Sequence, residues 1–184
     1  MRLRREPGAG NRERFITLTC VVIFSGATLA QVPDFSGTWK LDETRSQVVA
    51  TAGIAGLIPA GAPKTLHITQ PANGSVVIES QVNEAHVRIY RPGRETSTPA
   101  GQGGAVTMLS KWDGKSLASE GTVKAPNGDT SSVREVLSLS ADGKTLTMAV
   151  TTTTAAGKAS STVIYSKTTD VGPCETWPTP CKRQ

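Results

Sequence analysis

The chain has 184 residues, with 20 Lys or Arg against 15 Asp or Glu and a formal net charge of +5. Aromatic residues make up 4% of it, too few for a surface that stacks nucleic-acid bases. Five arginines and two glutamates fall within the first 14 residues, and beyond residue 30 the balance is 15 basic to 13 acidic residues. The basic character is therefore poor support for nucleic-acid binding.

The first 30 residues have the order of an export signal. Arginines dominate residues 1–14, an apolar run follows over 15–24, and small residues lead to Ala30. A charged start, an apolar middle and a small-residue cleavage site are typical of signal peptides. The run is too short to cross a bilayer, which takes about 20 residues. We expect cleavage after Ala30 and export to the periplasm or the medium.

The remaining chain shows a period of two and no twelve-residue window with a helical apolar stripe. Residues 31–169 are expected to form one all-β domain, an antiparallel up-and-down barrel of about 8–10 strands. Residues 47–63 are interpreted as a connection over one end of the sheet, and 96–104 as a loop. The predicted strands are 35–42, 64–71, 75–82, 85–91, 104–112, 115–124, 131–140, 144–153 and 160–168.

Two Asp-Gly steps predict hairpins and their registers. At Asp142-Gly143 a two-residue turn sets four apolar side chains on one face, with Leu139 facing Leu146 and Leu137 facing Met148. At Asp113-Gly114 the same rule gives a mixed face. Its pairs are Trp112 with Lys115, Ser110 with Leu117 and Met108 with Ser119.

A third hairpin is centred on Asn73-Gly74. A two-residue turn would oppose Ile68 and Glu79, whereas a bulged three-residue loop pairs Ile68 with Ile78, which we favour. The same register pairs Leu66 with Ser80. A following turn at Asn83-Glu84 then aligns Ile78 with Ile89 and Ser80 with Val87.

These registers gather polar residues on the other face of the three strands. His67, Glu79 and Arg88 become neighbours, with Tyr90 in the next row. A solvated face is the favoured interpretation, because the apolar residues lie on the opposite side. If the polar face lined a cavity instead, Arg88, His67 and Tyr90 could receive a ligand carboxylate.

Motifs for catalysis or metal binding are not found. The triplets Gly114-Lys115-Ser116 and Gly143-Lys144-Thr145 lack the upstream glycine of a phosphate loop, and two distant histidines do not suggest zinc. We expect no enzyme, cofactor or metal. Of three cysteines, Cys20 leaves with the signal, so Cys174 and Cys181 are expected to form a disulfide in the tail, residues 170–184.

The stretch Phe35-Ser36-Gly37-Thr38-Trp39-Lys40-Leu41 resembles the Gly-x-Trp strand that opens lipocalin-like (calycin) and fatty-acid-binding β-barrels. Together with Lys111-Trp112-Asp113-Gly114 and residues 137–146, it is similar to secreted bacterial proteins called lipocalin-like. The resemblance covers residues 34–168. It implies that Trp39 closes the barrel base, with Lys167 as its basic partner.

Such a barrel holds side chains alone or one small ligand. One hypothesis is therefore an exported protein that binds a small apolar or amphipathic molecule. Its rival is a solid-cored structural or interaction module. A membrane-integral barrel is rejected, because three Phe, two Tyr and three Trp cannot furnish two aromatic girdles. The proposed walls are Leu66, Ile68, Ile78, Ile89, Leu137, Leu139, Leu146 and Met148.

Overall fold

A computed structural model describes residues 32–49, 62–81, 85–99, 104–124 and 127–169. Ten antiparallel strands form one sheet in the order β4-β3-β2-β1-β10-β9-β8-β7-β6-β5, so each strand pairs with its sequence neighbour and β1 pairs with β10. This confirms an all-β, up-and-down, nearly closed barrel. The strands are β1 (Gly37–Leu41), β2 (Thr65–Thr69), β3 (Val76–Gln81), β4 (Ala85–Tyr90), β5 (Glu95–Pro99), β6 (Ala105–Asp113), β7 (Ser116–Lys124), β8 (Thr130–Leu139), β9 (Thr145–Thr154) and β10 (Gly157–Thr168).

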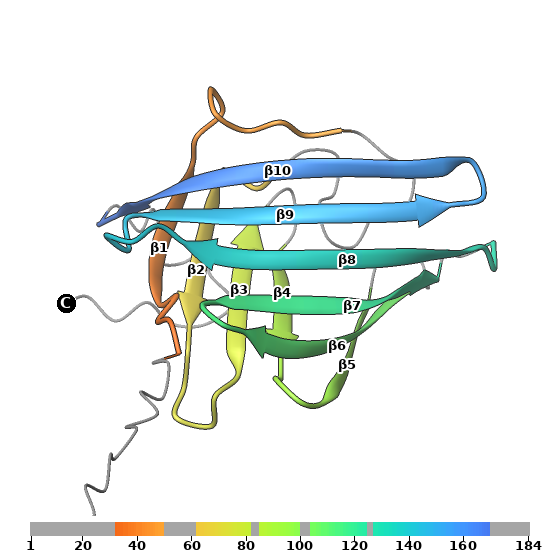
Figure 1. The fold of residues 1–184 in the computed structure, drawn as a ribbon, viewed down its shortest axis with the longest axis horizontal. Coiled ribbons are helices and arrows are strands. Elements are labelled where there is room, and N and C mark those ends of the chain that lie inside the picture. The colour runs from red at the N-terminus through yellow and green to blue at the C-terminus, as the bar shows by residue number, and fades with distance from the viewer. Residues whose placement is uncertain (1–31, 50–61, 82–84, 100–103, 125–126, 170–184) are drawn as a thin grey trace, which may run out of the picture.

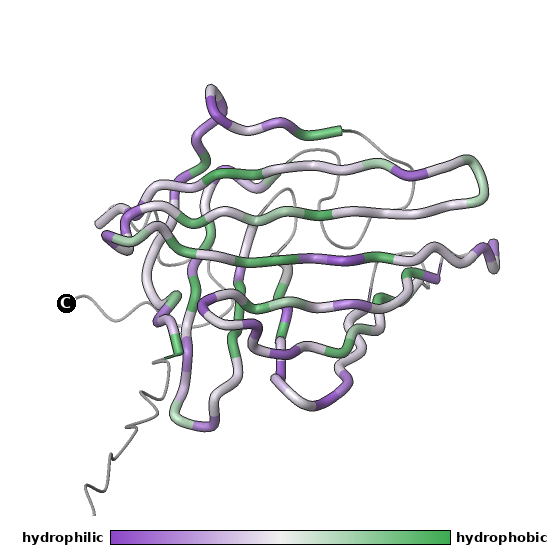
Figure 2. Tube along the Cα trace, in the orientation of Figure 1, coloured by the Kyte–Doolittle hydropathy of each residue, from purple (hydrophilic) through white to green (hydrophobic). Residues whose placement is uncertain are grey.

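The sheet folds over on itself so that its two halves cross. In Figure 1, β7 to β10 run across the front while β1 to β4 pass behind them in a crosswise direction. The inward side chains of both halves meet in one hydrophobic core, which includes Trp39, Leu66, Ile78, Leu117, Leu137, Leu146, Val150 and Val163. Figure 2 shows the hydrophobic residues spread along most of the strands, as expected when alternate side chains of each strand face the core.

One strand was not anticipated. Residues Glu95–Pro99 form β5, although 96–104 was predicted as a loop. The prediction was wrong for this part because the segment Glu-Thr-Ser-Thr-Pro has no apolar residue to reveal a period of two. A polar strand ending in proline is tolerated here because β5 is an edge of the sheet.

The turn predictions had mixed outcomes. The pairs Leu139–Leu146 and Leu137–Met148 across Asp142-Gly143 are confirmed, and so are Ile68–Ile78 and Leu66–Ser80 across Asn73-Gly74. The pairing at Asp113-Gly114 was wrong by two positions. Strand β6 extends to Asp113, which pairs with Ser116, so Gly114 and Lys115 form the turn and Trp112 lies opposite Leu117. Gly114 has a φ of 57°, the left-handed conformation that glycine adopts without strain.

The register between β3 and β4 was also wrong, by one residue. Ile78 pairs with Arg88 rather than Ile89, and Ser80 pairs with His86 rather than Val87. A shift of one residue exchanges the two faces of a strand. Arg88 and Tyr90 therefore face the barrel interior, the opposite of the favoured interpretation.

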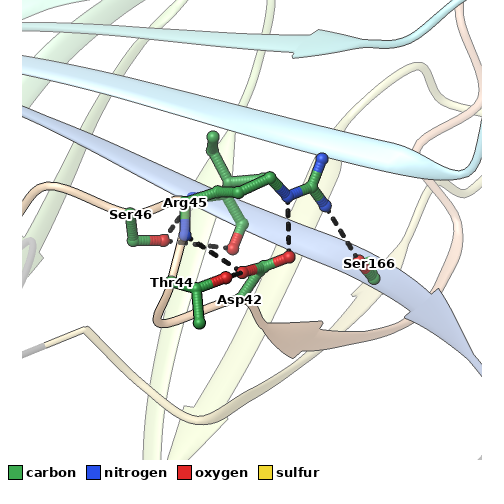
Figure 3. A network of polar contacts seen from close by, with 6 residues as sticks. Asp42, Thr44, Arg45, Ser46 and Ser166 are labelled. Atoms are coloured by element: carbon green, nitrogen blue, oxygen red, sulfur yellow. Dashed lines mark hydrogen bonds and ion pairs between the residues drawn. The ribbon is translucent and has the colours of Figure 1, made fainter.

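The chain after β1 is fastened to β10 by the polar network of Figure 3. The Asp42 carboxylate accepts hydrogen bonds from Thr44 Oγ1 at 2.7 Å and from Arg45 Nε at 2.7 Å, and Arg45 Nη2 donates to Ser166 Oγ at 3.3 Å. These bonds lower the pKa of Asp42 to about 2, with Thr44 the largest cause. Further along, Gln47 forms a bridge with Thr162, so this segment continues beside β10.

Several predictions fall outside the described residues: the signal peptide over 1–30 with cleavage at Ala30, the Cys174–Cys181 disulfide, and most of the 47–63 connection. Within the described part of the chain, no helix is long and apolar enough to cross a membrane.

Candidate binding site inside the barrel

The barrel is incomplete along one line, between the two edge strands β4 and β5, here called the seam. These strands end the sheet order and share no ladder. The link between them is tied to β6, because Gly93 N donates to Ser110 O at 2.8 Å and Pro92 forms a parallel bridge with Ser110. A pocket of about 10 Å³ opens at the seam, roughly the room that one water molecule needs. It is lined by Arg88, Ile89, Tyr90, Thr96, Thr98, Val106 and Met108.

Behind this pocket lies a buried carboxylate. Glu135, in the middle of β8, accepts hydrogen bonds on Oε2 from Arg88 Nη2 and from Tyr90 Oη, the latter at 2.7 Å. The Glu135 side chain is 0% exposed and that of Arg88 is 11% exposed, so the ion pair bridges the interior from β8 to the seam. The Arg88 guanidinium also lies 5.1 Å from the centre of the Tyr90 ring. Three side chains from two distant strands thus form one polar cluster, here called the Glu135 cluster.

Burial sets the electrostatics of this cluster. Removal from water raises the pKa of Glu135 above its ordinary value, while the charge and hydrogen bond of Arg88 act in the opposite direction. The phenol of Tyr165 on β10 lies within the field of both groups, and its pKa is raised, mainly by its own burial. The charged form of each acid is therefore costly inside the barrel unless a partner compensates it.

Two polar atoms in this region find no hydrogen-bond partner among the described residues: Glu135 Oε1 and Thr152 Oγ1. Glu135 lies opposite Val150 and Thr152 lies opposite Val133, so the two are diagonal neighbours on the inner face of β8 and β9. Thr152 is 1% exposed. Buried polar atoms are rarely left without a partner, so these two oxygens are hydrogen-bonding positions that a polar group of a ligand could use.

The four residues singled out from the sequence divide between two faces. Arg88 and Tyr90 belong to the Glu135 cluster inside the barrel. His67 and Glu79 are ladder partners on the face of β2 and β3 that points away from the core, where Glu79 is nevertheless 1% exposed and Thr38 Oγ1 lies 3.3 Å from His67 Nδ1. The structure does not bring the four together, because the one-residue change of register in β4 reverses the positions of Arg88 and Tyr90.

Sequence reasoning missed Glu135 and Thr152, although a signal was present for the first. Val133, Leu137 and Leu139 occupy alternate positions of β8, and Glu135 stands in the same inward series. Figure 2 shows a hydrophilic stretch in the middle of this strand with hydrophobic stretches directly on either side of it. A carboxylate in an inward series requires a buried cation. Thr152 lies in the run Thr151–Thr154, where nothing distinguishes it from its neighbours.

Trp39 and Lys167, the pair expected to close the barrel base, lie on the neighbouring strands β1 and β10. Trp39 is fully buried, and its Nε1 donates to Phe35 O at 2.9 Å. Lys167 lies directly opposite Trp39 in the ladder, with Nζ 5.3 Å from the centre of the indole ring. Gly37 has a φ of 135°, a conformation that favours glycine, and a Cβ there would lie 2.8 Å from Lys167 Cε.

The residues described contain no group of three or more His, Cys, Asp or Glu side chains that could hold a metal ion. Among the described residues, the polar groups that face the interior are one acid, Glu135, one base, Arg88, and several hydroxyls. Among the hydroxyls, Ser110 and Ser119 pair with each other at 2.8 Å. The arrangement offers hydrogen bonds and one compensated charge to a guest molecule.

Solved structures of similar shape are lipid-binding barrels. A protein titled REP1-NXSQ fatty acid transporter aligns with a TM-score of 0.53 at 16% identity, covering 73% of this chain and 96% of its own. Fatty-acid-binding protein 1 of Echinococcus granulosus aligns with a TM-score of 0.51 at 17% identity, covering 72% and 96%. Lipid binding protein 8 of Caenorhabditis elegans gives 0.50 at 15%, covering 73% and 95%. At these identities the likeness establishes the fold alone.

No family model matches the sequence, and a search of curated proteins gives no match. The strand order and the structural similarity together show that the chain has a ten-stranded, nearly closed barrel fold like that of these lipid-binding proteins. Its ligand preference depends on the side chains that face its own interior.

Proposed function

We propose that this protein is an exported, non-enzymatic barrel that binds one small amphipathic molecule. The polar end of the molecule would lie at the Glu135 cluster, and its apolar part would lie along the inner face near the seam. The similarity to lipid-binding barrels supports this class of function, since all three neighbours described above are named for lipids or fatty acids.

The observation that carries the proposal is the Glu135 cluster with its two unsatisfied oxygens. A buried ion pair is rarely worth its cost in stability, and apolar residues of similar volume are often as stable or more so. A barrel needing only a solid core would be better served by apolar side chains at positions 88 and 135. Polar groups held in such a place, next to an open seam, are typical of ligand sites.

Access would occur at the seam. It has no ladder of hydrogen bonds to break, and one side of it is lined by Met108, whose unbranched side chain adapts readily to a guest. Thr96 and Thr98 of β5 line the same side, since Thr96 is the ladder partner of Met108, and Arg88 and Tyr90 of β4 line the opposite side. Moving β5 away from β4 would enlarge the pocket without disturbing the ladders of the other eight strands.

The volume of the seam pocket favours a second candidate. At about 10 Å³ it receives one water molecule, and a lipid needs far more room. The alternative function is therefore a solid-cored module that acts through its outer surface. The two candidates make opposite predictions for a lipid probe, so one binding experiment separates them.

The experiment titrates the purified protein with Nile red, an apolar dye that fluoresces in a dry environment. The first function predicts saturable binding at micromolar concentration, and Met108→Trp should weaken it at least about fivefold by filling the pocket. Leu109→Trp is the matched control, since Leu109 is the next residue on β6 and is 54% exposed on the outer face. Failure of the dye to bind, or equal loss in both variants, would favour the solid-cored module.

Export belongs to the same proposal and has its own test. N-terminal sequencing of the protein expressed with residues 1–30 should give Gln31 as the first residue. Thiol titration of the denatured, unreduced protein should find no free Cys174 or Cys181 if the tail disulfide forms. An uncleaved N-terminus would contradict export by this signal.

A further inference from the structure

We infer that the polar end of the ligand is an uncharged hydroxyl, so the ligand is a small amphipathic alcohol rather than a fatty acid. This inference rests on the binding function proposed above and deepens it. It is drawn from the charges and free hydrogen-bonding positions of the Glu135 cluster.

The charges of Arg88 and Glu135 favour a neutral head group. A carboxylate ligand needs a cation, and Arg88 already gives its charge to Glu135 through a direct hydrogen bond. A second carboxylate would place two negative charges beside one positive charge in a water-poor interior, where like charges disfavour each other strongly. An ammonium ligand would face the guanidinium of the same cluster. A neutral head group avoids both penalties.

The second argument concerns the number and kind of vacant positions. Glu135 Oε1 can only accept a hydrogen bond when ionised, and Thr152 Oγ1 can donate as well as accept. A hydroxyl group has one hydrogen to donate and two lone pairs to accept with. One alcohol can therefore donate to Glu135 Oε1 and accept from Thr152 Oγ1, which satisfies both atoms at once.

The third argument is the surrounding surface. The diagonal placement of Glu135 and Thr152 on β8 and β9 leaves Val150 and Val133 beside them, both buried. Two strands away in the sheet, β6 adds Val106 and Met108, which line the seam pocket. An alcohol head group at the two oxygens would thus be flanked by apolar side chains that suit a hydrocarbon tail.

The test compares two probes that differ only in the head group, decan-1-ol and decanoate, as competitors of bound Nile red. Measurements are made at about pH 8, and the Arg88 guanidinium, which donates to Glu135 Oε2, favours the ionised form of Glu135. The native protein should bind decan-1-ol about tenfold more tightly than decanoate. Equal affinity, or preference for decanoate, would overturn the inference while leaving the binding function intact.

Two variants sharpen the result. Glu135→Gln removes the competing negative charge beside Arg88, so the preference should reverse in favour of decanoate. Thr152→Val removes a buried hydroxyl that has no hydrogen-bond partner among the described residues, so folding should not suffer. It should weaken decan-1-ol about five- to tenfold with little effect on Nile red.

The outcomes distinguish a failure of the binding function from a failure of the alcohol assignment. If neither probe nor the dye binds, the binding function itself fails, and the inference with it. If the dye binds but Thr152→Val leaves the affinity for decan-1-ol unchanged, only the alcohol assignment is wrong. Because Thr152→Val is expected to fold, this comparison decides even if Glu135→Gln does not yield folded protein.

Discussion

The ion pair inside the barrel makes a quantitative prediction about stability. Replacing Arg88 with Met leaves the fully buried Glu135 without its cation, and breaking a buried pair in this way costs about 3–5 kcal/mol. The structure favours the lower end, because Tyr90 Oη still donates to Glu135 Oε2 and the Arg88 side chain is already 11% exposed. We therefore expect Arg88→Met to lower the free energy of unfolding by about 3 kcal/mol at neutral pH.

The double variant Arg88→Met/Glu135→Leu removes both charges and should lie within about 1 kcal/mol of the native protein. Urea unfolding followed by tryptophan fluorescence measures the free energy of unfolding of the native protein, Arg88→Met and the double variant. The loss expected for Arg88→Met corresponds to a melting temperature lower by about 6–12 °C for a chain of this size. Arg134→Met is the control. Its pair with Glu120 is on the outer face of the same strand, with side chains 54% and 59% exposed, and is worth under about 1 kcal/mol. The reasoning would be refuted if Arg88→Met lost no more stability than Arg134→Met, or if the double variant were no more stable than Arg88→Met.

Three further predictions concern close packing, the base of the barrel and pH. Gly121→Ala should lower the free energy of unfolding by about 3 kcal/mol in urea, since its Cβ would lie 1.8 Å from a backbone oxygen of β6. Gly74→Ala has open space around it but a φ of 76°, and it should cost about 1 kcal/mol. Equal losses in the two variants would contradict this expectation. Lys167→Met should lower stability by about 0.5–1 kcal/mol through its contact with the Trp39 ring, and a loss unaltered in a Trp39→Leu background would show that the ring is not involved. Burial raises the pKa of Glu135, so its contribution to stability is present below the ordinary pKa of 4.5 and is lost as pH rises through the folded value. The native protein should therefore lose stability relative to Glu135→Gln as pH rises from acid to neutral, and a constant difference would contradict the raised pKa.

Much of the barrel could be predicted from the sequence because its signals are local. The Asp142-Gly143 turn and the alternating Leu and Met residues on either side fix one register with no further information. The bulged turn at Asn73-Gly74 was found in the same way. Strand β5 was not predicted because its pairing with β6 depends on backbone hydrogen bonds, and its polar sequence carries no apolar pattern that indicates a strand.

The candidate site could not be predicted in the same way, because it depends on a partner far away in the chain. Taken alone, β4 favours an arrangement with Val87 and Ile89 inward, since these are its apolar residues. The structure does the reverse and leaves Val87 37% exposed. Arg88 and Tyr90 turn inward to meet Glu135, 47 and 45 residues further along.

This reversal also explains why the site and the seam coincide. Strand β4 is an edge, with a ladder to β3 on one side and none to β5 on the other, so its register is constrained less than that of an inner strand. A charged pair formed with Glu135 can then decide which of its faces turns inward. Arg88 lies on that edge and also lines the seam pocket, so any molecule that enters there meets the cluster first. The line of the described sheet that has no ladder thus lies next to the Glu135 cluster, an arrangement that the proposed binding function requires.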